Sequence, residues 1–182
     1  MRRVAAHALF ALTALGCLPA DDRPEPGSVL VNVQRSEVAI EGFATDDGWS
    51  ISFDRFVTAI GEMRLAGDDC VDYSLADYDR LYDFTKADTS KASLHYGLGQ
   101  CTIEFGIGPP SGNTILMAGV TEADAELMRT EDPNAAEEPW HTRVGLMVVG
   151  HAERELDTKK FSWLVRQRQH IGACHTPEGT VN

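Results

Sequence analysis

A thiol and two imidazoles near the carboxyl terminus, Cys174, His170 and His175, are the residues best suited to chemistry. Sulfur and imidazole are the ligands that copper and zinc prefer in proteins. In an extended segment, His170 and Cys174 would share one face of the strand, and His175 would point to the other face. The sequence therefore offers a candidate copper-type site at these three residues, with a packed or disordered tail as the alternative.

An acidic stretch in the middle of the chain is a second candidate metal site. Residues 68–88 contain seven aspartates, among them Asp77, Asp79 and Asp83. Carboxylates two and four residues apart can gather around calcium, which takes about six to eight oxygen ligands. An EF-hand loop that began at Asp77 would need glycine where Tyr82 stands, so that motif is excluded. An irregular calcium loop and a solvated acidic loop remain as the two interpretations.

The sequence contains no recognisable catalytic motif. Neither G-x-S-x-G nor H-E-x-x-H occurs, and no pair of carboxylates stands out for acid–base catalysis. The glycine-rich segment 106–114 differs from a phosphate-binding loop, because Asn113 replaces the lysine and two prolines remove amide donors. We therefore expect a turn there and a protein that is not an enzyme. An enzyme whose site is assembled only in the fold is the alternative.

Three cysteines lie in the body of the chain: Cys70, Cys101 and Cys174. Cys70 follows the end of one expected strand and Cys101 opens another, which favours a disulfide between them. That bond would close a loop of about 31 residues and stabilise the fold by about 3.5 kcal/mol by restricting the unfolded chain. It would leave Cys174 as a thiol. A Cys101–Cys174 disulfide is the alternative.

Residues 1–16 have the features of an export signal. Arg2 and Arg3 supply the positive end, and residues 4–15 form an apolar stretch. A helix of that length is about 18 Å long, which is shorter than the roughly 30 Å hydrocarbon core of a bilayer. We therefore expect a cleaved signal peptide, and no later apolar run is long enough to span a membrane.

The end of this segment, Ala14-Leu15-Gly16-Cys17, resembles the lipobox of bacterial lipoprotein precursors. In that family the cysteine sulfur receives diacylglycerol, and after cleavage the cysteine is the acylated first residue. The resemblance implies lipidation of Cys17, attachment to a membrane and a place in the cell envelope, where Leu18 favours the outer membrane by analogy. Residues 17–27 would be an extended tether, and residues 28–182 one domain. Ordinary secretion is the alternative.

The composition is that of a globular protein, and its charge argues against one class of partner. The chain has 182 residues, of which 43% are hydrophobic and 24% charged. Removal of residues 1–16 takes away two arginines and no acid, so the formal net charge changes from −12 to −14. Such a surface repels phosphate backbones, and we expect no nucleic-acid binding.

Apolar residues recur with a period of two from residue 28 onward, which predicts strands. One expected strand includes Val29, Val31 and Val33, and Val38 and Ile40 continue its pattern. Residues 46–48 form a turn, and the next strand starts at residue 49. After residue 55 the phase of its apolar residues slips, which predicts a β-bulge near residues 54–55. A weaker strand signal follows over residues 81–84.

The second half of the chain predicts a strand, one helix and a hairpin. The strand covers residues 101–107, and the helix covers residues 121–129 on the surface, with Thr121 and Asp124 forming a capping box. A strand over residues 144–149 is followed by a turn at residues 155–158, after which Phe161, Trp163 and Val165 return as its partner strand. The fold class is therefore an antiparallel β-sandwich of immunoglobulin-like or transthyretin-like size with one short surface helix. The three tryptophans are expected in its core, although Trp140 could be exposed.

Residues 53–67, 101–110 and 143–165 resemble parts of small bacterial envelope lipoproteins, including the copper-associated methanobactin-partner type. The resemblance implies a β-sandwich and identifies no ligand set. We expect an exported, lipid-anchored module that binds an envelope protein or polysaccharide, or has a structural role. Copper binding at the carboxyl-terminal cluster is the first alternative, and an enzyme is the second.

Overall fold

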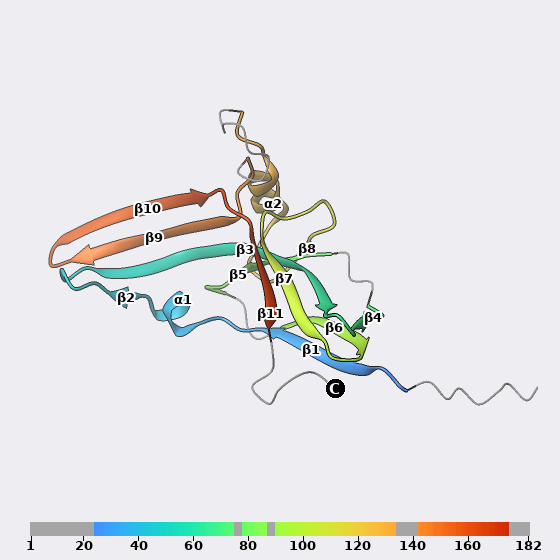
Figure 1. Cartoon of the computed structure of the whole chain (residues 1–182). Coiled ribbons are helices and arrows are strands. Elements are labelled where there is room, and N and C mark those ends of the chain that lie inside the picture. The colour runs from blue at the N-terminus through green and yellow to red at the C-terminus, as the bar shows by residue number, and fades with distance from the viewer. Residues whose placement is uncertain (1–23, 75–77, 87–89, 134–141, 175–182) are drawn as a thin grey trace, which may run out of the picture.

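The computed structural model describes residues 24–74, 78–86, 90–133 and 142–174. It confirms an all-β sandwich, in which a three-stranded sheet packs against a sheet of eight strands (Figure 1). The small sheet has the order β1 (Gly27–Val33), β6 (Ser90–Leu98), β4 (Val71–Asp72). The main path of the large sheet has the order β10 (Asp157–Val165), β9 (Leu146–Arg154), β3 (Ser50–Ala66), β5 (Arg80–Asp83), β8 (Ile115–Leu116). Off this path, β2 (Phe43–Ala44) pairs with β3, and β7 (Thr102–Gly108) pairs with β3 and β11 (Gln169–Cys174).

β3 runs through both halves of the molecule, and two β-bulges change the direction of its side chains. Opposite β9 the register shifts between Phe53 and Arg55, which confirms the predicted bulge. Opposite β7 it shifts again between Gly61 and Arg64, where Glu62 has a φ of 53°. One extra residue in a strand turns the side chains that follow it to the opposite face.

The second bulge lets β3 contribute to two cores. Before the bulge, Val57 and Ala59 pack with the core beneath helix α2 (Glu122–Arg129). After it, Met63 and Leu65 face the small sheet: the Met63 sulfur accepts a hydrogen bond of 2.9 Å from Ser93 of β6. One long strand of the large sheet therefore contributes side chains to both cores.

Helix α2 confirms the predicted capping box. The Thr121 side chain accepts a hydrogen bond from the backbone amide of Asp124. The Asp124 carboxylate in turn accepts a hydrogen bond from the backbone amide of Thr121. The inner face of the helix is part of a core, because Ala125 and Met128 are fully buried beside Leu81 and other residues. Within the described ranges, neither helix is long and apolar enough to cross a membrane.

The prediction that Val38 and Ile40 continue a strand is wrong, because they lie in helix α1 (Glu37–Glu41). Ser36 caps this helix by accepting from the backbone of Ala39, and Gly42 ends it with a φ of 76°. Local capping at both ends therefore outweighs the period-two apolar pattern. Both apolar side chains are about half exposed.

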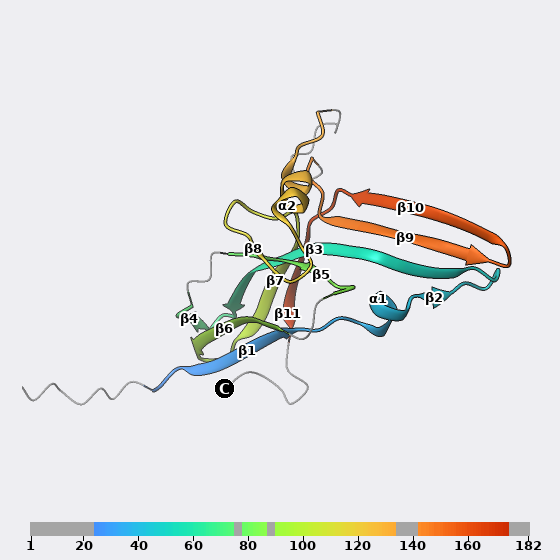
Figure 2. The same ribbon diagram turned by 180° about the vertical axis from the view of Figure 1, so that it is seen from behind.

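The predicted hairpin is confirmed, and it projects from the body of the molecule. We call β9, β10, β2 and residues 50–56 of β3 the wing (Figures 1 and 2). Its tip, the turn between β9 and β10, lies at the end of the molecule opposite the start of β1. The prediction that Trp163 is in the core is wrong, because it lies on β10 with 55% of its surface exposed. Trp49 is half-buried, and Trp140 lies outside the described residues.

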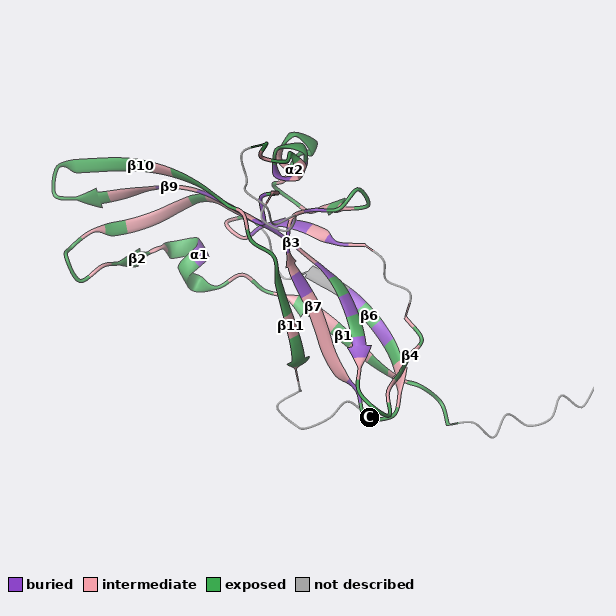
Figure 3. Cartoon of the chain, turned by 45° about the horizontal axis from the view of Figure 1, so that its top comes forward, coloured by how far each residue is buried: buried purple, intermediate pink, exposed green. Residues whose placement is uncertain are grey.

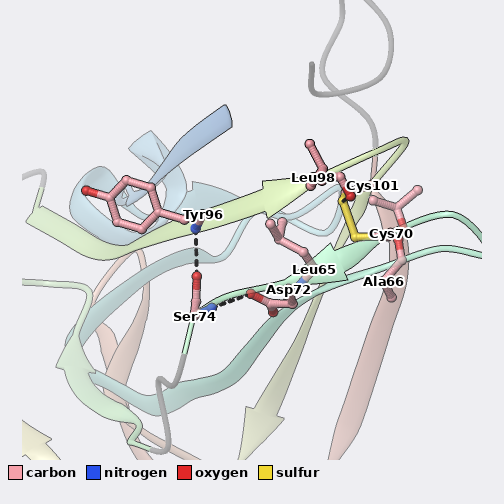
Figure 4. Close-up of a disulfide and its surroundings, with 9 residues drawn as sticks. Leu65, Ala66, Cys70, Asp72, Ser74, Tyr96, Leu98 and Cys101 are labelled. Carbon is pink, nitrogen blue, oxygen red and sulfur yellow. Dashed lines mark hydrogen bonds between the residues drawn. A yellow bond between two sulfur atoms is a disulfide. The ribbon is translucent and has the colours of Figure 1, made fainter. Parts of the chain in front are cut away.

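The predicted Cys70–Cys101 disulfide is present (Figure 4). Cys174 is a thiol. Cys70 follows the turn after β3, and Cys101 directly precedes β7. The bond therefore joins the edge of the small sheet to the large sheet. Beside it, Asp72 accepts hydrogen bonds from the backbone amides of Leu65 and Ser74.

Candidate binding site

The structure separates the residues predicted to bind copper. His170 of β11 pairs with Gly106, whereas Cys174 pairs with Ile103, and the register shifts between them. Because of this bulge, marked by a φ of 55° at Ala173, the two side chains point to opposite faces rather than sharing one. His175 lies outside the described residues, within which no group of three potential metal ligands gathers.

Two described aspartates of the acidic stretch, Asp79 directly before β5 and Asp83 at its end, bind protein groups. Asp83 is fully buried, and its carboxylate accepts from Arg55 and from the Phe56 and Thr85 backbone amides. Asp79 accepts from hydroxyl groups of a neighbouring loop, as described below. Asp77 lies outside the described residues. Asp79 and Asp83 are therefore engaged in contacts within the protein, and the described residues of the stretch include no group of three potential metal ligands.

A cleft of about 440 Å³ lies where β3, β7 and the segment before β5 meet. Its size is within the usual range of small-ligand sites, about 300–1,000 Å³. Gly61 of β3 pairs with Gly106 of β7, and Gly108 follows two residues later, so the floor carries little side chain. The walls and rim are formed by charged, aromatic and proline residues, namely Glu62, Tyr78, Asp79, Pro109, Pro110, Glu131, Arg143 and Arg168.

Glu62 is the unusual residue of this cleft. It is the extra residue of the second β3 bulge, and its left-handed backbone conformation is uncommon for a side chain other than glycine or asparagine. Its carboxylate lies above Gly106, so a Cβ atom added to Gly106 would be 2.9 Å from the Glu62 Oε2 atom. It also accepts a hydrogen bond from Arg168. Backbone strain of this kind is concentrated at functional sites.

A second arginine–glutamate pair forms the rim of the same cleft. Arg143, which precedes β9, donates to Glu131 at 2.8 Å. Both side chains are about half exposed, as are those of Glu62 and Arg168. The cleft therefore presents two neutralised pairs, each with guanidinium donors and carboxylate acceptors at the surface.

Asp79 fixes the wall between them. Its carboxylate accepts from the Thr114 hydroxyl at 2.6 Å, from the Ser111 amide at 3.1 Å and from the Ser111 hydroxyl. A Cβ atom on Gly61 would overlap the Asp79 side chain, so this wall packs directly against β3. The residue is buried, and its contacts hold the Pro109–Pro110 loop in place.

A third ion pair lies on the same face outside the cleft. Arg64 donates to Glu104 at 2.7 Å, and His170 is 3.4 Å from the same carboxylate oxygen. The hydrogen bond from Arg64 is the main cause of the lowered pKa of Glu104, although partial burial opposes it. This pair has the same chemistry as the rim pairs and does not line the cleft.

The wing presents a second surface, which we call the aromatic face: Phe43, Phe53, Phe56, Phe161 and Trp163. These rings come from β2, β3 and β10 and contact one another, with the ring centres of Phe53 and Phe161 at 6.3 Å and Phe161 stacked on Trp163 at 4.4 Å. Gly150 lies between Phe53 and Phe161 in the same row. Much of the wing is exposed (Figure 3).

The sequence does not predict the cleft, because only part of its signal is local. The alternating glycines at residues 106 and 108 are visible in the sequence, but they read as a turn beside two prolines. The second phase slip of β3, around Glu62, carries no distinct pattern. The arginines come from segments far apart in the chain, and only the fold brings them together.

Comparison with protein-family models, with curated proteins and with solved structures finds no match to this chain. The class of the protein is therefore defined by its own fold and surfaces: it is an all-β sandwich that carries a charged cleft and an exposed wing.

Proposed function

We propose that this protein is an exported, lipid-anchored module of the cell envelope. In this proposal its cleft binds neutral sugar units of an envelope polysaccharide without catalysing a reaction. The observation that carries the ligand class is the rim of the cleft, which consists of two arginine–glutamate pairs over a glycine floor.

The anchor is proposed from the lipobox-like residues that end in Cys17. A disulfide in the domain supports an oxidising compartment, because such bonds persist outside the cytosol. Residues 18–27 could span at most roughly 35 Å, so the start of β1 would stay close to the bilayer. The wing tip, at the opposite end of the molecule, would then point away from the membrane.

The ligand class follows from the pairing of charges in the cleft. A charged ligand would have to displace one member of an arginine–glutamate pair and leave the other without its partner. A sugar hydroxyl both donates and accepts, so it can bond the carboxylate and the guanidinium of one pair at the same time. The net charge of −14 expected after signal removal also repels polyanions. Neutral polyhydroxylated units therefore fit best.

The anchor is tested by replacing Cys17 with serine in the producing cell. The wild-type protein should fractionate with membranes, and mass spectrometry should find an acylated Cys17 as its first residue. The Cys17→Ser protein should lose both properties. A serine variant that stays equally membrane-bound, or a wild-type protein that retains Met1, would contradict the proposed anchor.

The ligand is tested by calorimetric titration of the purified acylated protein in detergent micelles. The probes are neutral gluco-, galacto-, manno- and N-acetylglucosamine oligosaccharides, with oligogalacturonate as the polyanionic comparison. We expect a neutral probe to bind, Glu62→Gln and Arg143→Gln to weaken its binding at least tenfold, and Arg64→Gln to leave it unchanged. Arg64 is the matched control, because its ion pair lies outside the cleft. Binding of the polyanion alone, or equal binding by all variants, would overturn the proposed ligand class.

A further inference from the structure

We propose that two copies of this chain associate through the outer edges of β10, forming one continuous sheet with a two-fold axis at Phe161. Among the strands that the structure describes, β10 pairs with β9 alone and ends the order of the large sheet. It has nine residues, and all but Phe161 are exposed. This inference is independent of the proposed cleft ligand and of the lipid anchor.

The edge of β10 lacks the usual protection against pairing over half of its length. Soluble proteins guard edge strands with charges, prolines, bulges or very short strands. Lys159 and Lys160 guard the half near the tip, but residues 161–165 contain no charge and no proline. The register with β9 is continuous throughout, so no bulge twists the edge away.

The hairpin register shows which backbone groups are available. Arg154 and Asp157 flank a two-residue turn and pair with each other. In such a hairpin the flanking pair is hydrogen-bonded, and bonded and non-bonded pairs then alternate. The odd-numbered residues of β10 therefore bond to β9. The N–H and C=O groups of the even-numbered residues point outward, from Thr158, Lys160, Ser162 and Leu164.

Charge selects the register of a second copy. An antiparallel pairing centred on Lys159 or Lys160 would place identical lysines opposite each other, and one centred on Trp163 would place Lys160 opposite Arg166. Like charges directly opposite destabilise a pair of strands.

A pairing centred on Phe161 avoids these contacts. It places Lys160 opposite Ser162 of the other copy, and Lys159 opposite Trp163 of the other copy. Lys159 already lies 5.0 Å from the ring centre of Trp49, so it makes this kind of cation–π contact within one chain. A pairing centred on Ser162 would instead place Lys159 opposite Val165. The register centred on Phe161 is therefore the favoured one.

This register also extends the aromatic face. Phe161 would contact Phe161 of the other copy across the axis, and Trp163 would contact Lys159 of the other copy. Because the two β10 strands run in opposite directions, the two bodies would lie at opposite ends of the joined wings. The partner at this edge is thus a second copy of the chain. It would be bound by backbone hydrogen bonds between the two β10 strands and by contact of Lys159 in each copy with Trp163 in the other.

The first test uses the full chain with Cys17→Ser, so that acyl chains cannot cause association. Sedimentation velocity over a range of concentrations should reveal a monomer–dimer equilibrium. Ser162→Pro removes an outward N–H and no β9–β10 hydrogen bond, so it should abolish the dimer while circular dichroism stays unchanged. Ser162→Ala is the matched control and should still dimerise. A protein that is monomeric at all concentrations overturns the proposal, and so does a dimer that tolerates Ser162→Pro.

The second test fixes the register without relying on stability. In the same background with Cys174→Ala, Phe161→Cys places two thiols opposite each other at the axis, within disulfide distance. Mild oxidation should link most of this variant into covalent dimers. Thr158→Cys is the control, because its neighbour in the other copy is Leu164, and it should stay unlinked. Efficient linkage of Thr158→Cys instead of Phe161→Cys would contradict the register.

Discussion

At the scale of single residues, Glu62 joins a left-handed backbone to a charged side chain that lines the cleft. For an L-residue this conformation costs roughly 1–2 kcal/mol relative to an ordinary one. Glycine would remove the strain but also the carboxylate, whereas alanine would remove only the carboxylate. The residue therefore allows the energetic cost of the backbone to be separated from the contribution of the side chain.

We predict that Glu62→Gly is more stable than Glu62→Ala by about 1 kcal/mol. Both variants lose the half-exposed ion pair with Arg168, so the difference reports the backbone strain. Urea denaturation of both variants measures the free energy of unfolding. Glu104 lies in regular strand β7, and there Glu104→Gly should be less stable than Glu104→Ala, because glycine weakens a strand interior. Equal stability of the two Glu62 variants would show that the backbone is not strained.

His95 is a second residue with an effect on the whole fold. It lies on β6 facing the large sheet with 1% of its surface exposed. Its Nε2 atom is 2.6 Å from the Ser93 hydroxyl, and its Nδ1 atom has no hydrogen-bond partner among the residues that the structure describes. Burial lowers the pKa of His95, although the negative charge of Asp72 partly opposes this. The neutral imidazole is therefore the form that the folded protein contains near neutral pH.

We predict that the protein loses stability as the pH falls below about 6.5, the unperturbed histidine pKa. In that range the unfolded chain binds a proton that folded His95 resists, so the free energy of unfolding decreases until the lower folded pKa is reached. Urea denaturation at a series of pH values measures the slope. In the His95→Gln variant, the free energy of unfolding should change less steeply with pH over the same range. An unchanged slope in that variant would assign the pH dependence to other groups.

At the scale of elements, Arg55 connects three parts of the fold from the first bulge of β3. Its guanidinium donates to Asp124 of α2 at 2.9 Å and 3.0 Å, and to Asp83 of β5 at 3.1 Å. Partial burial would raise the pKa of Asp124, but hydrogen bonds from Arg55 and Thr121 outweigh it and hold the pKa below its usual value. The bulge places Arg55 where it can reach both carboxylates.

Removing this guanidinium should be strongly destabilising. We predict that Arg55→Met lowers the free energy of unfolding by about 3–5 kcal/mol, because it leaves the buried Asp83 carboxylate without its charge partner. Thermal and urea denaturation measure the loss. Arg129→Met on helix α2, the helix that carries Asp124, is the control, since its ion pairs have exposed glutamates and should contribute less than about 1 kcal/mol. Similar losses in the two variants would contradict the central role of Arg55.

The elements also show how far the sequence alone could lead. Short-range signals were sufficient for the β9–β10 hairpin, the Thr121 cap, the first bulge and the Cys70–Cys101 pair, because each depends on residues close in sequence or on strand ends. The sequence does not predict helix α1, because its apolar residues alternate as in a strand and this pattern conceals the helix cap at Ser36. The cleft was missed because its rim depends on contacts between distant segments, such as Arg168 with Glu62.

At the scale of the whole molecule, β3 links two cores that differ in how they are held. The core beneath α2 is closed by a helix and by the Arg55 contacts. The layer between the two sheets depends on Met63, Leu65 and the buried Ser93–His95 pair, and the Cys70–Cys101 disulfide bonds its edge covalently. The small sheet should therefore be the part of the molecule that opens most readily when that bond is absent.

We predict that Cys70→Ala together with Cys101→Ala lowers the free energy of unfolding by about 3.5 kcal/mol, because the unfolded chain regains the freedom of a loop of about 31 residues. Native-state hydrogen exchange should show a larger loss of protection in β6 than in α2, because the small sheet loses its covalent attachment while the Arg55 contacts persist. The Cys174→Ala variant is the control, and it should retain wild-type stability within about 0.5 kcal/mol since its thiol is partly exposed and unbonded to another cysteine. If α2 and β6 lose protection equally, the two cores unfold as one unit, and β3 transmits stability between them rather than merely joining them.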